Sequence, residues 1–286
     1  MDILYQIRVR QDSFSAAEAR IARLMLSDIS FAASASLDEL ALRAEVSSAT
    51  LSRFARSVGC RDLRDLRLQL AQASGVGNRF LDSASMPEQS AFFRQIVGDI
   101  ESTLHEHLAG FNGEKFADAV RLLSEARMIH AFGMGGCSSV CSDELQVRLV
   151  RLGYPIAACH DAVMMRVVAA TLGAEHAVIV CSLTGQTPEL IEAVKLAHNY
   201  GAKVIAITRP ASPLAELADV VLALQGVETS FIYKPTAARY GMLLAIDVLA
   251  TELALSMPEA NQERLRRIKL ALDDYRGGDD CLPLGD

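Results

Sequence analysis

Residues 177–188 read Ala-Val-Ile-Val-Cys-Ser-Leu-Thr-Gly-Gln-Thr-Pro, and the class of the fold follows from them. The first five residues form an apolar run without alternation, which is typical of a strand buried on both faces of a parallel sheet. Glycine and hydroxyl side chains follow from Ser182 to Thr187, and Pro188 suits the first turn of a helix. This stretch therefore predicts a strand, a turn and a helix of an α/β sheet.

Four further short apolar runs have the same character, at 128–132, 155–158, 204–208 and 220–224. Helical patterns lie between most of them, around 138–152, 162–171 and 188–200. Five strands alternating with helices predict a doubly wound, Rossmann-like sheet of five parallel strands. Since ligands of such sheets bind outside the carboxyl ends of the strands, the turns at those ends are the first candidates for a site.

Two of these turns have the chemistry of a phosphate site. The first, Gly133-Met-Gly-Gly-Cys-Ser-Ser139, precedes a helix, and the second is Ser182 to Thr187. Glycines let the backbone approach an anion, while free helix amides and hydroxyl groups donate hydrogen bonds to it. Two ordinary turns are the alternative. A nucleotide site is disfavoured, because the Gly-Lys-Ser/Thr ending and the third glycine of a dinucleotide site are both absent.

The first third of the chain shows a different pattern, which predicts four short helices. Residues 15–18 and 36–39 form capping boxes, each followed by apolar residues at helical spacing. The first helix carries its apolar stripe as far as Ile29, and the fourth helix spans residues 62–71. Residues 72–90 are rich in Gly and Ser and predict a linker to a second domain.

The second and third of these helices form a helix-turn-helix pattern. The third begins near Ser47 or Ser48 and stops at Gly59. In that motif the second helix of the pair enters the major groove of DNA by its N-terminal end. Apolar residues commit the other side of the helix to the core, so the DNA-reading face is predicted to consist of Ser47, Ser48, Thr50, Arg53 and Arg56.

The charge distribution agrees with a DNA-binding module. The whole chain has 28 Lys and Arg against 35 Asp and Glu, a net charge of −7, but residues 1–79 hold eleven arginines against nine acids and no lysine. Arginine is the better reader of phosphate and guanine. Arg61, Arg64 and Arg67 are expected to follow the DNA backbone. A plain helical bundle with a solvated arginine-rich face is the alternative.

Metal, cofactor and membrane functions are not expected. The six cysteines are scattered without a CxxC pair, and buried free thiols are the simplest interpretation. Two histidines, at 105 and 107, point to different faces of a helix. No apolar run approaches the length of a membrane span, and Arg8, Arg10 and Asp12 interrupt any signal peptide. The chain is expected to be cytoplasmic and soluble, without a metal or a cofactor.

The residues quoted above carry a family resemblance. Residues 181–190 (Cys-Ser-Leu-Thr-Gly-Gln-Thr-Pro-Glu-Leu) and 197–208 resemble the SIS (sugar isomerase) domain, a phosphosugar-binding fold, and the likeness covers about 125–255. The N-terminal helices resemble the helix-turn-helix domain of the RpiR family of transcriptional regulators. Residues 160–164 and 228–250 are similar to the HexR-like subgroup of that family.

The resemblance implies a phosphosugar ligand held by both turns. The usual Gly-x-Gly-x-Ser pattern sets Cys137 in the place of its serine, whereas counting back from Arg148, Arg151 and Gly153 selects Ser138. Gln186 stands where the HexR-like pattern has arginine. Glu228 and Arg239 are expected to contact sugar hydroxyls or a carboxylate, or else to form an ion pair, and Asp161 to cap a helix. The predicted ligand-binding set is Gly135, Gly136, Ser138, Ser182, Thr184, Gly185, Gln186, Thr187, Glu228 and Arg239.

These observations predict an all-α helix-turn-helix domain (1–77), connecting helices (78–124), an α/β SIS domain (125–265) and a C-terminal tail (266–286). The expected function is a repressor of sugar catabolism genes that binds double-stranded operator DNA as a homodimer or higher oligomer. Its expected effector is a phosphorylated sugar or sugar acid such as 2-keto-3-deoxy-6-phosphogluconate. Helix 88–109 and the apolar helix 240–255 are candidate association surfaces. A phosphosugar isomerase that uses Glu228 or His160 as a base is the rival function, and a scaffold that does not bind DNA is a third.

Overall fold

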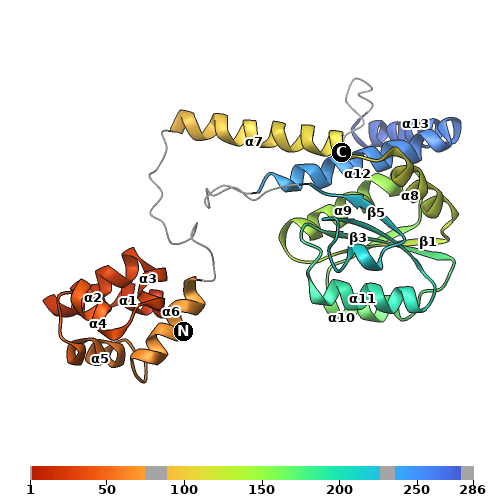
Figure 1. The fold of residues 1–286 in the computed structure, drawn as a ribbon. Coiled ribbons are helices and arrows are strands. Elements are labelled where there is room, and N and C mark those ends of the chain that lie inside the picture. The colour runs from red at the N-terminus through yellow and green to blue at the C-terminus, as the bar shows by residue number, and fades with distance from the viewer. Residues whose placement is uncertain (1, 75–88, 226–235, 278–286) are drawn as a thin grey trace. The chain divides into compact units, whose positions relative to one another are not determined.

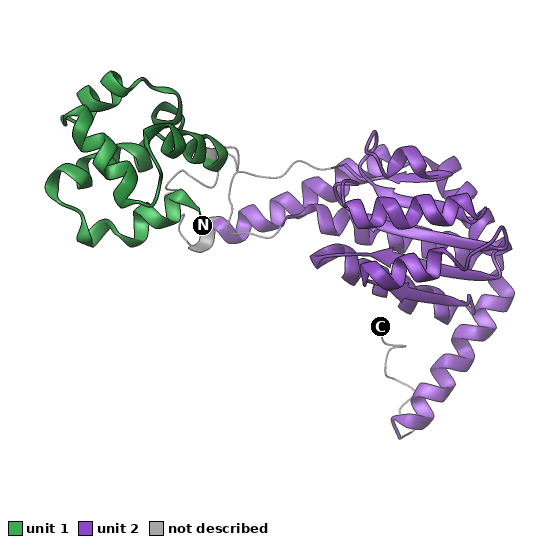
Figure 2. Ribbon diagram, turned by 90° about the horizontal axis from the view of Figure 1, so that it is seen from below, with its two compact units in different colours: residues 1–86, 230–233 green, residues 87–229, 234–286 purple. Residues whose placement is uncertain are grey.

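The computed structural model describes residues 2–74, 89–225 and 236–277 (Figure 1). They form two compact units with separate hydrophobic cores, residues 2–74 in one and residues 89–225 and 236–277 in the other (Figure 2). The two units are described separately below.

The first unit is entirely helical in its described residues. Its α-helices are α1 (Ile3–Val9), α2 (Ala16–Ser27), α3 (Ile29–Ser34), α4 (Leu37–Arg43), α5 (Ser48–Ser57) and α6 (Leu63–Ser74). Both predicted capping boxes are confirmed: Ser15 Oγ accepts from the Glu18 amide and Ser36 Oγ from the Glu39 amide, while each glutamate accepts from the backbone of its serine. These bonds set the starts of α2 and α4.

Four helices were predicted in this unit, whereas its described residues form six α-helices. α1 was missed because a helix of seven residues carries too few apolar positions to show a period. The predicted helix through Ile29 is two helices, since the Asp28 carboxylate accepts a hydrogen bond from the Phe31 amide at 3.0 Å and starts α3. Both short helices are held by packing, because Ile3, Ile7 and Ile29 are buried in the common core.

The second unit contains the predicted five-stranded parallel sheet. Its strands are β1 (Met128–Gly133), β2 (Ile156–Cys159), β3 (His176–Ser182), β4 (Lys203–Thr208) and β5 (Val220–Ala223). Their order is β2-β1-β3-β4-β5, and all neighbouring strands are parallel. In the central strand β3 every residue after His176 is buried, as the unalternated apolar run predicted.

Helices cover both faces of the sheet (Figure 1). One face packs against α8 (Gly113–Glu125), α9 (Gly136–Arg151) and α12 (Ala238–Ser256), and the other against α10 (Ala162–Ala169) and α11 (Pro188–Asn199). The doubly wound architecture is therefore confirmed. The chain reverses direction across the sheet at β1, because β2 lies on one side of β1 and β3 on the other.

Three helices differ from the sequence expectations. α12 supplies Met242, Ala245, Ile246 and Leu249 to the core, so most of its apolar residues are accounted for by packing within the chain rather than by association. α13 (Pro258–Tyr275) was not predicted, and it runs through the predicted boundary at 265/266. α8 also belongs to the core of the second unit and not to a connecting segment.

α7 (Gln89–Gly110) agrees with the predicted helix 88–109. Within the described residues, no single helix is long and apolar enough to cross a membrane. α12 and α13 pass such a test only as a pair, by length and composition, and they are bent by 110° at the break between them.

Candidate functional site

The two glycine–hydroxyl turns lie side by side in the second unit. Gly133, the last residue of β1, pairs with Cys181 of β3, and Ser182 follows at the end of that strand. The crossover from β1 runs through α9 on one face of the sheet, and the crossovers next to β3 run through α10 and α11 on the other face. Doubly wound sheets bind ligands at the point where such crossovers reverse, outside the carboxyl ends of the strands, and we call this region between the two turns the crevice.

The first turn brings its backbone close to α9. A β-carbon at Gly133 would collide with the carbonyl oxygen of Ser138 and would lie 2.7 Å from Ser142 Oγ, so only glycine fits there. Gly135 has a φ of +74° and precedes the first helical residue, Gly136. Because no side chain caps α9, its first backbone amides remain available to an anion.

The hydroxyls after this turn have different roles. Ser139 Oγ donates to the Gly135 carbonyl at 3.0 Å, and Ser142 Oγ donates to the Ser139 carbonyl at 2.8 Å, so both are used inside α9. Ser138 stands at the third helical position, and its hydroxyl has no hydrogen-bond partner among the described residues. Of these three serines, Ser138 is the one whose hydroxyl is available to a ligand.

The second turn is held rigidly. Ser182 Oγ accepts from the Gly185 amide at 3.1 Å, and Thr184 Oγ1 accepts from the Gln186 amide at 3.3 Å. Gly185 has a φ of +65°, and a β-carbon there would collide with Ser212 Oγ. Thr187 precedes α11, yet its side chain makes no capping bond. The start of α11 is thus a second open helix N-terminus beside the first.

Thr208 is a site residue that the sequence interpretation missed. It ends β4 and pairs in register with Ser182. Its Oγ1 is fully buried without a hydrogen-bond partner in the part of the chain that the structure describes, and it would lie 2.8 Å from a β-carbon on Gly185. A buried hydroxyl without a partner is costly, so Thr208 is a candidate donor or acceptor beneath the second turn. The signal in the sequence was a polar residue that closes an apolar run.

Cys137 has an unusual electrostatic environment. Its Sγ lies 3.7 Å from the Sγ of Cys141 one turn later. A hydrogen bond from Cys141, aided by the positive charge of Arg239, lowers the pKa of the Cys137 thiol from 9.0 to about 7 against the opposing effect of burial. The same contact, together with burial, raises the pKa of Cys141. With a pKa of about 7, the Cys137 thiol is partly ionised at neutral pH.

Arg239, a predicted ligand-binding residue, acts electrostatically on Cys137 of the first turn. It lies in the first turn of α12, where its Nη2 donates to Tyr240 Oη at 3.2 Å. Glu228 lies outside the described residues. Asp161 caps α10 by accepting from the Met164 amide at 2.8 Å, as predicted, and His160 Nε2 pairs with Asp143 at 3.2 Å. Among the described residues, no group of His, Cys, Asp or Glu side chains is arranged to hold a metal ion.

In the first unit, α4, the turn after it and α5 form the helix-turn-helix pattern. The turn is closed by a hydrogen bond from the Val46 amide to the Ala41 carbonyl at 3.0 Å. Leu51, Phe54 and Ala55 of α5 are fully buried. The opposite side of the helix carries the five predicted DNA-reading residues, Ser47, Ser48, Thr50, Arg53 and Arg56, of which Ser47, Arg53 and Arg56 are exposed and the other two half-buried.

A chain of hydrogen bonds organises this surface. Ser47 Oγ accepts from the Thr50 amide at 3.2 Å and contacts Thr50 Oγ1 at 2.9 Å, and Arg53 Nη2 donates to the same Thr50 Oγ1 at 3.3 Å. Ser47 is thus the N-cap of α5, and its hydroxyl is used in hydrogen bonds within the protein. Ala49 is exposed beside it and was not among the predicted residues.

Several arginines of this unit brace the fold. Arg20 of α2 donates to the carbonyl groups of Ala44 (3.2 Å) and Glu45 (3.0 Å) in the turn of the motif, where Glu45 has a φ of +53°. Arg67 of α6 donates to the carbonyl groups of Ala33 and Ser34 at the end of α3, at 3.2 and 2.9 Å. These contacts join segments far apart in the chain, which is why sequence patterns did not reveal them.

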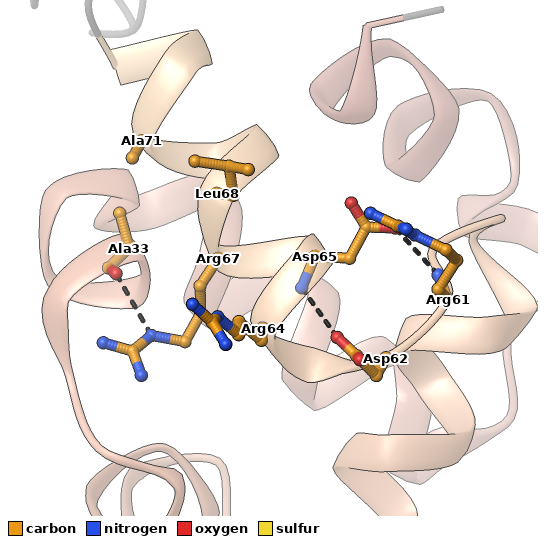
Figure 3. A pocket seen from close by; sticks show the side chains of 8 residues that line it. All are labelled: Ala33, Arg61, Asp62, Arg64, Asp65, Arg67, Leu68 and Ala71. Carbon is orange, nitrogen blue, oxygen red and sulfur yellow. Dashed lines mark hydrogen bonds and ion pairs between the residues drawn. The ribbon is translucent and has the colours of Figure 1, made fainter.

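A hollow of about 770 Å³ beside α6 is lined by Arg64 and Arg67 of that helix and by Arg61, which precedes it (Figure 3). Arg61 pairs with Asp65 at 3.3 Å, and Arg67 is bound to Ala33 as described above. Arg64 is exposed and has no partner among the described residues. Of these three arginines, Arg64 is the one whose whole guanidinium is open to a phosphate, because Arg61 and Arg67 already bind groups of the protein. The prediction that all three follow the DNA backbone therefore applies most directly to Arg64.

Comparisons with known proteins agree with both halves of this description. A family model for the SIS domain matches residues 122–252, and a model for the helix-turn-helix domain of the rpiR family matches residues 1–75. The chain is 34% identical to the HTH-type transcriptional regulator HexR of Pseudomonas aeruginosa over 273 residues, 95% of each chain. It is 30% identical to HexR of Escherichia coli K12 over 288 residues, 100% of this chain and 99% of that protein.

Solved structures show the same fold. NanR of Vibrio vulnificus, complexed with ManNAc-6P, gives a TM-score of 0.60 at 22% identity and covers 94% of this chain and 98% of that chain. The sugar isomerase domain of an RpiR transcription factor from Sphaerobacter thermophilus gives a TM-score of 0.55 at 24% identity, and covers 63% of this chain and 98% of that domain.

Proposed function

The chain belongs to the RpiR family of helix-turn-helix transcriptional regulators with a SIS domain, and we propose that it represses sugar catabolism genes under the control of a phosphorylated sugar or sugar acid. The family resemblance of the sequence is confirmed, and the two relatives that match over nearly their full length are named as transcriptional regulators. The observation that carries the proposed effector is the pair of uncapped helix N-termini, each beside a glycine–hydroxyl turn, at the point where the sheet reverses.

The phosphate of the effector is proposed to lie between the two turns. Ser138 and Thr187 offer hydroxyls without local partners, while Ser182 and Thr184 hold the second turn in shape and have lone pairs and protons left for a ligand. Backbone amides of both helix starts complete the cradle. The proposed set is Gly135, Gly136, Ser138, Ser182, Thr184, Gly185, Gln186, Thr187 and Arg239, to which Glu228 is added from outside the described residues.

Arg239, the cationic side chain of the proposed site, favours an effector that carries a carboxylate as well as a phosphate. Arg239 adds a guanidinium next to the first turn, and guanidinium groups bind carboxylates in two-pronged fashion. Gln186 offers an amide where the subgroup pattern has arginine, so the effector has one cationic partner fewer on that side. A compound such as 2-keto-3-deoxy-6-phosphogluconate combines the required phosphate and carboxylate, and the amino-sugar phosphate that NanR binds, ManNAc-6P, is the natural comparison.

The DNA-reading function is proposed for α5. Arg53 and Arg56 project from its exposed side, and Ser48 and Thr50 lie near its start, where recognition helices contact base edges. A single helix-turn-helix reads a short half-site, so we infer that the protein acts as a homodimer or higher homo-oligomer on a paired site, in the cytoplasm where the operator DNA is found.

Thermal unfolding against a panel of phosphorylated sugars and sugar acids tests the effector site. A ligand at a hundredfold excess over its dissociation constant stabilises the native state by about 2.7 kcal/mol, so the true effector raises the melting temperature. The double variant Ser182→Ala with Thr184→Ala is expected to lose this shift. Thr251→Ala, which removes an exposed hydroxyl of α12 away from the site, is the matched control and keeps it. A panel without any shift contradicts the proposed sensing role.

A further inference from the structure

α9 is apolar on two opposite sides. On the inner side Cys141, Leu145 and Leu149 are buried against the sheet and α12. On the outer side the exposed positions recur after four, three, four and three residues, starting from Gly136 at the beginning of the helix. We name the side-chain-bearing members of this outer row the α9 stripe: Val140, Asp143, Val147 and Val150.

The three valines of the α9 stripe are unusually open to solvent. Val140 is 62% exposed, Val147 41% and Val150 58%. Alternating spacings of three and four are the seam along which one helix packs on another. A helix with apolar residues on both sides is typical of one that is buried on both sides, and an apolar row left at the surface marks an interaction site.

We propose that the α9 stripe is the surface on which a second copy of this chain associates, with the two α9 helices antiparallel across a twofold axis. The inference rests on the proposed function, since it names the surface through which that regulator pairs its two DNA-reading units. Such an interface is made of the same patch on both copies, so the patch must complement itself.

The order of charges along α9 favours a second copy over another partner. Asp143 and Glu144 lie in the first half of the helix, and Arg148 and Arg151 in the second half; within the chain Glu144 accepts a hydrogen bond from Arg148 at 2.6 Å, and Asp143 lies 3.2 Å from His160. An antiparallel pair sets the acidic half of each helix opposite the basic half of the other, whereas a parallel pair sets like charges together. Asp143 within the stripe adds a polar position, which in helix seams fixes the register of the pair.

The surface next to Val150, the last valine of the α9 stripe, also suits the charge of an antiparallel partner helix. Val150 borders a hollow of about 550 Å³ between α9 and α13, whose lining includes Arg151, Arg264 and Arg267. In the antiparallel arrangement the acidic half of the partner's helix comes to lie over this basic hollow. The charges of the hollow and of the approaching helix are therefore opposite.

One edge of the sheet, β2, is partly closed to the other common mode of pairing, in which a strand is added from a second copy. β2 is the edge strand next to α9. The backbone amide of Ala158 on β2 donates to Gln146 Oε1 of α9 at 2.6 Å, so this edge group is already satisfied and is not available to an added strand.

In this assignment α9 both contributes to the phosphate site and forms the dimer interface. Its first turn holds Gly136 and Ser138 at the proposed phosphate site, and its stripe begins two residues later at Val140. A ligand that draws the start of α9 toward its phosphate shifts the stripe against the partner helix, and small helix shifts at subunit interfaces are an established means of coupling a ligand to a global change. The effector then alters the separation of the two DNA-reading helices.

Sedimentation velocity of the full chain at micromolar concentration tests the proposal. Val147→Glu sets a charge in the middle of the stripe without disturbing the core side of α9. Val167→Glu on α10 (Val167 is 52% exposed) and Val97→Glu on α7 (Val97 is 54% exposed) are matched controls, the second of which tests the predicted association surface of helix 88–109. The wild type and both controls are expected to sediment as dimers or larger, and Val147→Glu at half the dimer mass.

The helical circular dichroism of each variant checks that it is folded, and Val150→Glu replaces Val147→Glu if the latter is not. The proposal is overturned if both stripe variants sediment like the wild type, if only Val97→Glu or Val167→Glu dissociates, or if the wild type is a monomer. Failure of the proposed function has a different signature, namely no thermal shift with any phosphorylated sugar and no salt-dependent binding to duplex DNA, whatever the sedimentation shows.

Discussion

At the scale of single residues, Cys137 is the most testable feature of the crevice. Its thiol has a pKa lowered to about 7, chiefly by the hydrogen bond from Cys141, whereas burial raises the pKa of Cys60 to about 11 and also raises that of Cys181. Thiolates are the reactive form, so iodoacetamide is expected to label Cys137 before the other four cysteines that the structure describes, with a rate that reaches half its maximum near pH 7. Peptide mass spectrometry across a pH series measures this.

The same labelling reports on the ligand. A phosphorylated effector in the crevice is expected to slow alkylation of Cys137 and to leave the exposure of the other cysteines unchanged. Cys137→Ser is the control that removes the fast phase. Labelling of Cys137 at neutral pH no faster than that of Cys60 contradicts the described environment.

Gly185 is the second residue for which the structure predicts a clear effect of substitution. Its positive φ strains any other residue, and its missing β-carbon leaves room for Ser212 and Thr208. Gly185→Ala is expected to cost more than the ~1–3 kcal/mol of backbone strain alone and to abolish the ligand shift. Gly201→Ala also sets alanine at a positive φ (+89°), but the nearest atom to its added carbon, in Ala174, lies at an ordinary contact distance of 3.7 Å, so it is the control. Equal unfolding free energies in urea for the two variants contradict this packing.

At the scale of elements, two arginines with similar sequence context are expected to behave oppositely. Arg53 points outward from α5, while Arg67 ties α6 to the end of α3 through two carbonyl groups. Arg53→Ala is expected to weaken duplex binding at least tenfold with an unchanged free energy of unfolding. Arg67→Ala is expected to lose about 1–3 kcal/mol of stability. Fluorescence anisotropy with duplex DNA measures the binding of each variant, and urea denaturation measures its stability. The account is contradicted if Arg67→Ala keeps the stability of the wild type but binds duplex DNA more weakly.

The elements also show how far the sequence predicts this protein. All five strands and the helices that cover them followed from apolar runs and helical spacing, since burial on both faces leaves a strong local signal. α1, α3 and α13 did not, because the first two are too short to show a period and most of α13 faces solvent. Thr208, Arg20 and the brace of Arg67 were missed for a related reason, since their roles arise from contacts between distant segments that no local pattern encodes.

At the scale of the whole molecule, the chain joins a helix-turn-helix unit and a SIS unit, and the proposed function is a coupling between them. α9 is the element proposed to carry that coupling, since it begins at the phosphate cradle and its outer row is the proposed dimer surface. If so, Val147→Glu keeps the thermal shift with the effector but loses at least tenfold in affinity for a paired operator site, because each copy then binds one half-site alone. Anisotropy with paired and single half-site duplexes measures the loss, and equal losses on both contradict the coupling.

The most direct test of the account is the affinity of the full chain for its operator, measured by anisotropy with and without the phosphorylated sugar that raises its melting temperature. The operator is first selected from a pool of random duplexes. Allosteric coupling of ordinary size changes affinity by about 5- to 150-fold, and a change in this range is predicted for the wild type and none for Ser182→Ala with Thr184→Ala. An effector that binds the crevice yet leaves operator affinity unchanged contradicts the account.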